Sequence, residues 1–344
     1  MQCSHKRTFS PTAVLGLLLI MFASVTAFAQ YKVIPLDSTV AGKAKHQDGL
    51  LTNAWGLTYG PKTPFWISDE GTGWSTTYDG KGDLKSARII VPSAGAGAGT
   101  PTGIAYNGLS SEFLVEGWAS IFLFATLDGT ISGWAPQSNP GASIIAVNNS
   151  KSGAVYTGLA ITHRASGNLL FAADLANNRV DVYDAAFVLK HSFTDPDVPA
   201  GWGPFGIQDI KGKVYVGFAP ADGSTGGFVD IFNEGGVMLK ERFIHGKPVD
   251  QPWGFAIAPA DFGALSNALL ISNNTNKGTI NGFDPNTGKF IGTVTNSSGN
   301  PVVIHQLWGI KFGGGGGLNG SRNHLYYTAG PDNNEQGTFG VIEP

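Results

Sequence analysis

Apolar residues in this sequence occur in short runs interrupted by Gly, Pro, Asn and Asp, and amphipathic helical periods are scarce. Six runs are alternating or fully apolar, as in β-strands with one or both faces buried. They comprise residues 65–67, 121–125, 169–173, 214–218, 269–272 and 325–328. Short strands separated by turn residues predict an all-β fold, which the 49 glycines also favour.

A short phrase precedes each of these runs: a small or aromatic residue, then glycine, then an aliphatic or aromatic residue. Its glycines are Gly56, Gly103, Gly158, Gly206, Gly254 and Gly309, which are 47, 55, 48, 48 and 55 residues apart. This spacing is too long for leucine-rich or helical repeats and fits one four-stranded propeller blade with its connections. Six units in register predict a six-bladed β-propeller, and a seven-bladed ring would lack a seventh glycine anchor.

The two ends of the chain are complementary. The last unit offers only three strands, around residues 308–312, 324–328 and 338–342, whereas residues 31–36 form a strand with no partner nearby. If the N-terminal strand pairs as the outer strand of the last blade, the ring closes without an unpaired seam. Pro35 is acceptable there, because an outer strand needs backbone donors on one side only.

Residues 1–29 have the features of a signal peptide. Lys6 and Arg7 precede a short apolar stretch, residues 13–23, and Ala27 and Ala29 match the small residues of a cleavage site. We therefore expect cleavage after Ala29, secretion or export to the periplasm, and a mature single propeller domain of residues 30–344 with no membrane span. The only cysteine lies within the predicted signal, so no disulfide is expected.

The charge balance limits the classes of partner. The formal net charge is −3, and the basic residues form no cluster. This composition argues against binding to nucleic acid and to anionic membrane surfaces. The mature protein is expected to be a monomer.

Several phrases resemble known propeller families. Residues 170–184 are similar to the middle hairpin of NHL-type repeats, which places the chain near the NHL and gluconolactonase-like propellers. Residues 53–57, 64–69, 128–134 and 327–332 resemble an uncharacterised family of secreted bacterial propeller proteins. Some members of that family carry a PEP-CTERM sorting tail. The resemblance implies a six-bladed fold and no established activity; this sequence lacks an apolar tail before Pro344, so free release is expected instead of sorting.

Polar residues in two sets of loops are candidates for ligand binding. In a propeller, the loops entering the innermost strands and the loops joining the second and third strands surround one mouth of the channel, the usual ligand site of the architecture. The first set supplies Asn53, Thr102, Gln251, His305 and Gln306, and the second supplies Asp69, Asp128, Asp174, Asn273 and Asp332. Trp55, Trp253 and Trp308 are expected beneath or beside this mouth.

These residues fit two functions and one purely structural interpretation. Amides beside tryptophans suit a small molecule, a saccharide or a peptide, and the outer blade edges suit a cell-surface polymer. Alternatively, converging oxygen atoms could hold a divalent cation such as Ca²⁺ and support hydrolysis of lactones or related esters. Structurally, Asp or Asn after a strand caps a turn, and tryptophan before glycine packs one blade on the next. Ligand binding without established catalysis is the leading hypothesis, and no catalytic residue is assigned.

Overall fold

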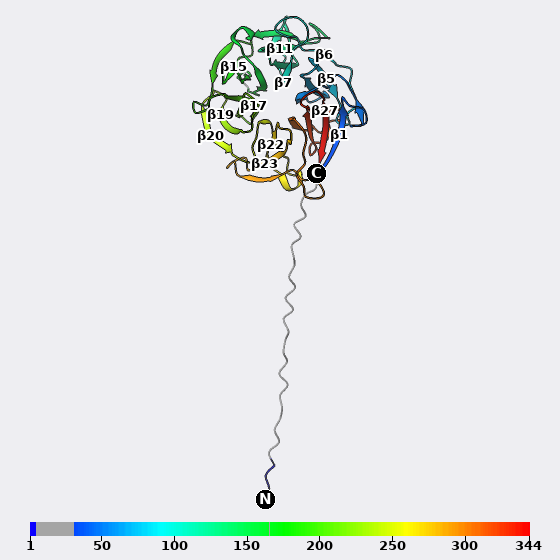
Figure 1. Cartoon of the computed structure of the whole chain (residues 1–344), viewed down its shortest axis with the longest axis vertical. Helices are drawn as coiled ribbons and strands as arrows, with labels where there is room; N and C mark the ends of the chain where they lie inside the picture. Colours follow the sequence, from blue (N-terminus) through cyan, green and yellow to red (C-terminus); the bar gives the residue numbers. More distant parts are fainter. Residues whose placement is uncertain (5–30, 165) are drawn as a thin grey trace.

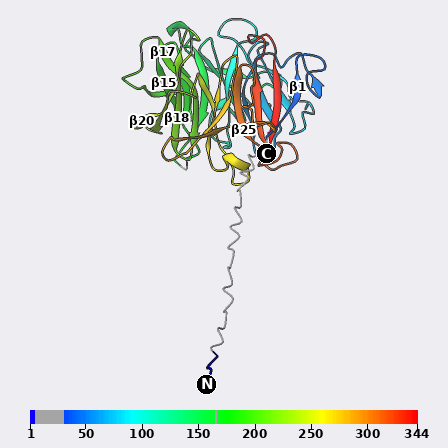
Figure 2. The same cartoon turned by 60° about the horizontal axis from the view of Figure 1, so that its bottom comes forward.

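Six sheets form blades around a central axis, which confirms the predicted six-bladed all-β propeller (Figure 1). The computed structural model describes residues 1–4, 31–164 and 166–344. The predicted signal peptide lies almost entirely outside these residues. The strands run between the two faces of the ring, as the view in Figure 2 shows.

The strands of each blade follow one order from the axis outward. The innermost strands are β3 (Ala54–Thr58), β7 (Pro101–Tyr106), β13 (Tyr156–Ile161), β17 (Trp202–Ile210), β21 (Pro252–Ile257) and β25 (Leu307–Phe312). The second strands are β4 (Phe65–Asp69), β10 (Phe122–Thr126), β14 (Leu170–Asp174), β18 (Lys213–Pro220), β22 (Leu269–Asn273) and β26 (Leu325–Ala329). The third strands are β5 (Trp74–Tyr78), β11 (Thr130–Trp134), β15 (Arg179–Tyr183), β19 (Phe228–Asn233), β23 (Ile280–Phe283) and β27 (Thr338–Glu343). The outer strands are β6 (Ile89–Ile90), β12 (Ile144–Asn148), β16 (Leu189–Phe193), β20 (Met238–His245), β24 (Phe290–Thr293) and β1 (Lys32–Ser38).

The remaining elements are short. The two-residue strand β2 (His46–Gln47) pairs with β1 in parallel, and β8 (Leu114–Val115) and β9 (Trp118–Ala119) form a hairpin in blade 2. The 3₁₀ turns η1 (Ser150–Ser152) and η2 (Gly263–Leu265) complete the set. In the described parts of the chain, no helix has both the length and the apolar character needed to span a bilayer.

The N-terminal strand closes the ring as predicted. β1 pairs antiparallel with β27, and Figure 1 shows the first and last strands of the propeller side by side. The register shifts between Pro35 and Asp37, so the proline coincides with a β-bulge. A bulge accommodates a residue that lacks a backbone donor.

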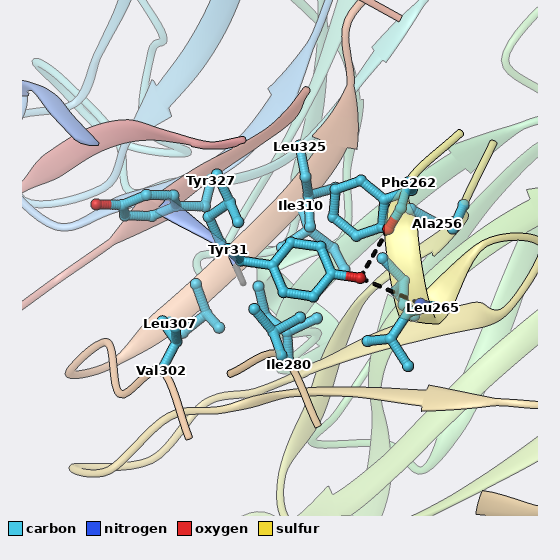
Figure 3. Packing of buried hydrophobic residues seen from close by; sticks show 14 of the residues in the cluster. Tyr31, Ala256, Phe262, Leu265, Ile280, Val302, Leu307, Ile310, Leu325 and Tyr327 are labelled. Atoms are coloured by element: carbon cyan, nitrogen blue, oxygen red, sulfur yellow. Dashed lines mark hydrogen bonds between the residues drawn. The ribbon is translucent and has the colours of Figure 1, made fainter. Parts of the chain in front are cut away.

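Tyr31, immediately before β1, fixes this closure to the neighbouring blade. Its ring is buried among apolar side chains of blades 5 and 6 (Figure 3). Its hydroxyl donates to the Phe262 carbonyl oxygen at 2.7 Å and accepts from the Leu265 backbone nitrogen at 3.1 Å. One side chain therefore links the N-terminal segment to η2 of blade 5.

The repeated glycines mark the closest approach of neighbouring inner strands. A Cβ atom on Gly103 would lie 2.1 Å from the Leu159 backbone nitrogen, and one on Gly206 would lie 2.1 Å from the Trp253 carbonyl oxygen. Gly56 and Gly309 face neighbouring backbone at 2.6 and 2.8 Å in the same way. The phrase that identified the blades thus recurs because the ring has little room for a side chain at this level of the channel.

Candidate functional site at the ends of the channel

Four aromatic side chains fill the channel at the end where the inner strands begin. Trp55 and Trp308 stack with ring centroids 3.5 Å apart, and Trp253 meets both rings edge-on at 6.1 and 5.8 Å. Phe205 completes the group, and the four residues are only 3–8% exposed. We call these four residues the aromatic plug. The stack of Trp55 on Trp308 joins blade 1 to its neighbour blade 6, which is the blade-to-blade packing expected of these tryptophans, and Trp253 extends the contact to blade 5.

Hydrogen bonds hold the plug in place. The Trp253 Nε1 donates to the Thr157 carbonyl oxygen at 3.0 Å, which joins blade 5 to blade 3 across the axis. The Trp308 Nε1 donates to the Asn53 Oδ1 at 3.1 Å. Trp253 and Trp308 are therefore buried at little polar cost, whereas the Trp55 Nε1 has no hydrogen-bond partner among the described residues. This end of the channel is therefore closed by side chains that are fixed at several points.

Three predicted ligand-binding residues have a shared backbone role beside the plug. Asn53, Gln251 and Gln306 each stand three residues before an anchor glycine, and each has a left-handed backbone with φ of 48°, 46° and 45°. The Asn53 Nδ2 donates to Glu70 at 2.5 Å, and the Gln251 Nε2 donates to the Gly223 carbonyl oxygen at 2.7 Å. These amides therefore brace the loops that lead into the tryptophans.

The other predicted residues of the first loop set differ in exposure. Thr102 is fully buried, and its Oγ1 donates to the Tyr156 carbonyl oxygen at 2.7 Å. The Gln306 Nε2 donates to the Asn276 Oδ1, and His305 is exposed at the surface. Ligand binding by these residues stays a prediction.

The predicted carboxylate and amide groups of the second loop set are hydrogen-bonded to the protein itself. The Asp128 Oδ2 accepts from the Ala94 backbone nitrogen at 2.5 Å, and the Asp174 Oδ1 accepts from Val155 at 3.0 Å. The Asn273 Nδ2 donates to the Pro248 carbonyl oxygen at 2.6 Å, and Asp332 is exposed and accepts from Gln336. The contacts of Asp128, Asp174 and Asn273 thus tie the second loop set to the segments that lead into the inner strands. A ligand role for these residues stays a prediction.

Asp69 is the exception in this second set. It is fully buried, and neither carboxyl oxygen has a hydrogen-bond partner among the described residues. Burial raises the pKa of Asp69 well above its ordinary value. This burial disfavours the charged carboxylate, the form that binds a cation.

Among the described channel residues, no three acidic side chains approach closely enough to share the divalent cation that the converging oxygen atoms suggested. In the described ranges, the one group of three acidic residues whose oxygens approach closely enough to share an ion is Asp195, Asp197 and Glu241. This group comes from the end of blade 3 and the outer strand of blade 4, and the Arg242 Nη1 lies 2.9 Å from Asp195. A resident cation thus has no matching set of carboxylates in the channel.

The opposite end of the channel is open and polar. At the ends of the inner strands, a cavity of about 120 Å³ is lined by Tyr59, Tyr106, His163, Asp209 and Lys311 among others. A narrower space of about 40 Å³, bordered by the anchor glycines, lies next along the channel toward the plug. β25 and β27 both run antiparallel to β26, so this cavity opens on the face that carries the C-terminus (Figure 2). We call it the basal cavity.

Lys311 is the principal charged group of the basal cavity. Its Nζ lies 5.4 Å from the centroid of the Tyr59 ring, a favourable cation–π geometry. Within the described parts of the chain, no carboxylate oxygen lies within 4.0 Å of this ammonium group. Burial lowers the pKa of Lys311 from its ordinary value of 10.5. Among the described residues, the cavity therefore contains a desolvated ammonium group with no carboxylate at ion-pair distance.

His163 and Asp209 of the basal cavity also have perturbed pKa values. Partial burial lowers the pKa of His163, and the charge of Lys311 lowers it further. Burial raises the pKa of Asp209 to about 6, although the Gly212 backbone N–H opposes the change. Perturbed groups gathered in a cavity are typical of binding or catalytic sites.

Sequence reasoning did not select these residues, yet the repeats contained a signal for them. Two positions after the anchor glycine, the six blades carry Thr58, Ala105, Ala160, Gln208, Ala256 and Lys311. A lysine among small or neutral residues at one repeat position is an anomaly in an inner strand. The neighbouring position carries Tyr59, Tyr106 and Asp209 in three of the blades.

A larger surface hollow adjoins the basal cavity between blades 1 and 2. Tyr106 lines both spaces, and the hollow has a volume of about 740 Å³. The β8–β9 hairpin forms one wall, where Trp118 is 52% exposed. The Asn107 Nδ2 fixes the base of this insertion by donating to the Glu112 and Ser120 carbonyl oxygens at 3.0 and 2.9 Å.

The fold and the channel define a six-bladed β-propeller that is closed at one channel end and open at the other. No family model matches the chain. It is 30% identical over 346 aligned positions to uncharacterized protein R648 of Acanthamoeba polyphaga mimivirus, covering 94% of this chain and 83% of that protein. Uncharacterized protein L690 of the same virus is also 30% identical, and the match covers 84% of this chain and 80% of that protein. The chain therefore belongs to the family of these mimivirus proteins. The expected membership of a secreted bacterial family stays a prediction.

Solved structures show the same fold at low sequence identity. A catalytically inactive virginiamycin B lyase from Staphylococcus aureus with quinupristin has a TM-score of 0.53 and 14% identity, covering 92% of this chain and all of that one. A gluconolactonase from Xanthomonas campestris has a TM-score of 0.53 and 13% identity, covering 85% of this chain and 86% of that one. The likeness supports the predicted relation to gluconolactonase-like propellers at the level of fold.

Proposed function

We propose that this protein is a ligand-binding propeller whose small-molecule ligand enters the basal cavity. The observation that carries the proposal is the contrast between the channel ends. One end is filled by the aromatic plug, whereas the other holds Lys311 and Asp209 with no ion pair between them. Unpaired charged groups in a partly enclosed space are costly to maintain, which favours a ligand-binding role for them.

Further features support binding at this mouth. Tyr59 and Tyr106 supply aromatic surface, and the adjoining hollow with Trp118 gives a route from solvent. The Tyr59 hydroxyl donates to the Phe312 carbonyl oxygen at 2.8 Å, which fixes the ring beside Lys311. Aromatic walls with a few fixed polar groups suit a small polar ligand. A saccharide or a short peptide remains compatible with the wider hollow.

A ligand screen with a blocking variant tests this function. A panel of monosaccharides, sugar acids, amino acids and dipeptides is screened by thermal shift against the mature protein. His163→Trp, at the exposed rim, is expected to abolish the shift given by any binder, whereas Asp332→Trp at the closed end should leave it unchanged. A binder that keeps its affinity in His163→Trp, or a panel without a single binder, contradicts the proposal.

The alternative function, metal-dependent hydrolysis of lactones or related esters, has weaker support. The gluconolactonase likeness concerns the fold, and the channel carboxylates do not converge. That function predicts lactone turnover that EDTA abolishes and Ca²⁺ restores. Lactone turnover lost in a variant of Asp174 or Asn273 would favour it over binding.

We also propose that the protein is exported through residues 1–29, as in the secreted bacterial proteins that it resembles, and that it acts as a monomer. Residues 6 and 7 with the apolar stretch 13–23 support export. N-terminal sequencing of protein recovered outside the cytoplasm should begin at Gln30. Gel filtration at micromolar concentration checks the oligomeric state.

A further inference from the structure

Lys311 is unusual in both its position and its surroundings. It lies on the inner strand β25, where the other five blades carry uncharged residues at the same repeat position. Its side chain is partly buried in the basal cavity and stands over the Tyr59 ring. Burying a cation without a paired carboxylate is unfavourable, because the cation loses part of its hydration and no ion pair compensates for that loss.

The other polar groups of the cavity do not satisfy this cation. The Tyr59 hydroxyl is hydrogen-bonded to Phe312, and the Gln208 Nε2 donates to the Asp209 carbonyl oxygen at 3.1 Å. The Asp209 Oδ2 is buried without a hydrogen-bond partner among the described residues, and the electrostatic neighbours of this carboxyl are Gly212 and Glu234 of its own blade. Lys311 thus keeps its ammonium donors available to a molecule in the cavity.

His163 adds a second donor on the same side. It follows the inner strand β13 at the exposed rim of the cavity, close enough for the charge of Lys311 to be felt at its imidazole. An imidazole and an ammonium that face one space are both hydrogen-bond donors to an oxyanion. An anion placed between them would favour the charged forms of both groups.

We infer that Lys311 and His163 recognise an oxyanion, a carboxylate or phosphate group, on the ligand of the basal cavity. This inference rests on the proposed binding function and names the chemical group that the site selects. A charge-assisted hydrogen bond from Lys311 anchors the anionic group, and the Tyr59 ring holds the ammonium in place. The rest of the ligand extends past Tyr106 toward the hollow with Trp118.

The side-chain signals of the lysines provide a direct test on the wild-type mature protein. Lysine labelled with ¹³C at Cε is incorporated, and the Lys311 signal is assigned as the one missing in Lys311→Arg. Sodium acetate, sodium phosphate, sodium chloride and glucose are then titrated to about 50 mM, which is enough to reveal millimolar dissociation constants. Acetate or phosphate, but not chloride at matched ionic strength, is expected to shift the Lys311 signal saturably. A response to acetate alone assigns a carboxylate, and a response to phosphate alone assigns a phosphate group.

A matched variant separates recognition from general charge effects. In a thermal-shift titration, Lys311→Met is expected to weaken binding of the responding anion by at least about tenfold, because a hydrogen bond to a charged group is lost. Lys289→Met removes an exposed lysine immediately before β24 and should leave the affinity for the anion unchanged. If Lys311 responds to no oxyanion while glucose or another neutral panel member gives a thermal shift that His163→Trp abolishes, the inference fails and the binding function survives. If no probe shifts either the Lys311 signal or the melting temperature, both fail.

Discussion

The two ends of the channel are built from the same six repeats, yet one is closed and the other is open. At the closed end, the residue before the anchor glycine is Trp55, Trp253 or Trp308 in three blades and Phe205 in a fourth. At the open end, the residues after the glycine are small in some blades and polar in others. A repeated backbone therefore sets where side chains enter the channel, whereas the side chains at each position decide whether the channel is filled.

Breaking the aromatic plug should have the largest effect on stability. Trp308→Ala removes a ring stacked at 3.5 Å on Trp55 and the donor to Asn53. We expect a loss of about 3–5 kcal/mol in the free energy of unfolding, as for large aromatic residues truncated in a core. Urea unfolding of the mature protein measures it. Trp118→Ala, which is 52% exposed at the open end, should cost less than about 1 kcal/mol. Equal losses would contradict the difference between the two ends.

Filling the space between inner strands should have the next largest effect. Gly206→Ala places a Cβ 2.1 Å from the Trp253 backbone oxygen, so strands β17 and β21 must move apart. The expected cost is about 2–3 kcal/mol, the usual range for overpacking. Gly158→Ala is the matched control, because its nearest contact is a side-chain methyl group, Ile207 Cγ2, at 3.1 Å. A smaller loss for Gly206→Ala than for Gly158→Ala would show that the backbone contact is not limiting.

These two variants concern features that the sequence made visible. The anchor glycines and the pairing of residues 31–36 with the last blade were predicted because repeats and unpaired strands leave a local pattern. The tryptophans were expected to pack one blade on the next, and the stack of Trp308 on Trp55 does so. That their rings also fill the channel was not predicted, because sequence spacing does not say how far a side chain reaches toward the axis. The hydrogen bond from Trp253 to Thr157 spans two blades and has no local signature.

The candidate site shows the same limit more strongly. Asn53, Asp128 and Asn273 were selected because polar residues in loops suggest ligand contacts, and the structure shows their polar atoms bonded within or between loops. Lys311 and Asp209 lie within strands, where the pattern suggests packing. Their lack of partners depends on burial and on neighbours from other blades, which the alignment of the repeats alone does not give.

Asp209, the buried carboxyl of the open end, should change the free energy of unfolding by about 1 kcal/mol in a pH-dependent way. The pKa of Asp209 is raised from 3.8 to about 6 in the folded protein. Between these values the folded protein binds more protons than the unfolded chain, so stability falls as pH rises through this window. Asp209→Asn is therefore expected to be about 1 kcal/mol more stable than wild type at pH 7 and no more stable below pH 3.8.

The pKa of Asp222 is shifted in the opposite direction from that of Asp209. Its carboxylate is exposed and accepts a hydrogen bond from the Ser224 backbone nitrogen at 2.9 Å, which lowers its pKa. The stability from this group is present at neutral pH and is lost as pH falls through the lowered pKa. Asp222→Asn should consequently gain nothing at pH 7. The same gain in both variants would show that any charge removal stabilises this acidic protein.

The smallest expected effect distinguishes a binding lysine from a structural one. Burial lowers the pKa of Lys311 below 10.5 in the folded protein. At pH values between this lowered pKa and 10.5, the unfolded chain binds more protons than the folded protein, so stability rises with pH. Lys311→Met should be more stable than wild type by about 0.5 kcal/mol at pH 7, and the gap should close as pH approaches 10.5. Urea unfolding across this range measures the gap. A responding oxyanion should narrow it at pH 7, because the anion binds folded wild type and not the variant. A destabilised variant would mean that the ammonium group stabilises the empty cavity, and Lys311 would then belong with the plug tryptophans as a structural residue.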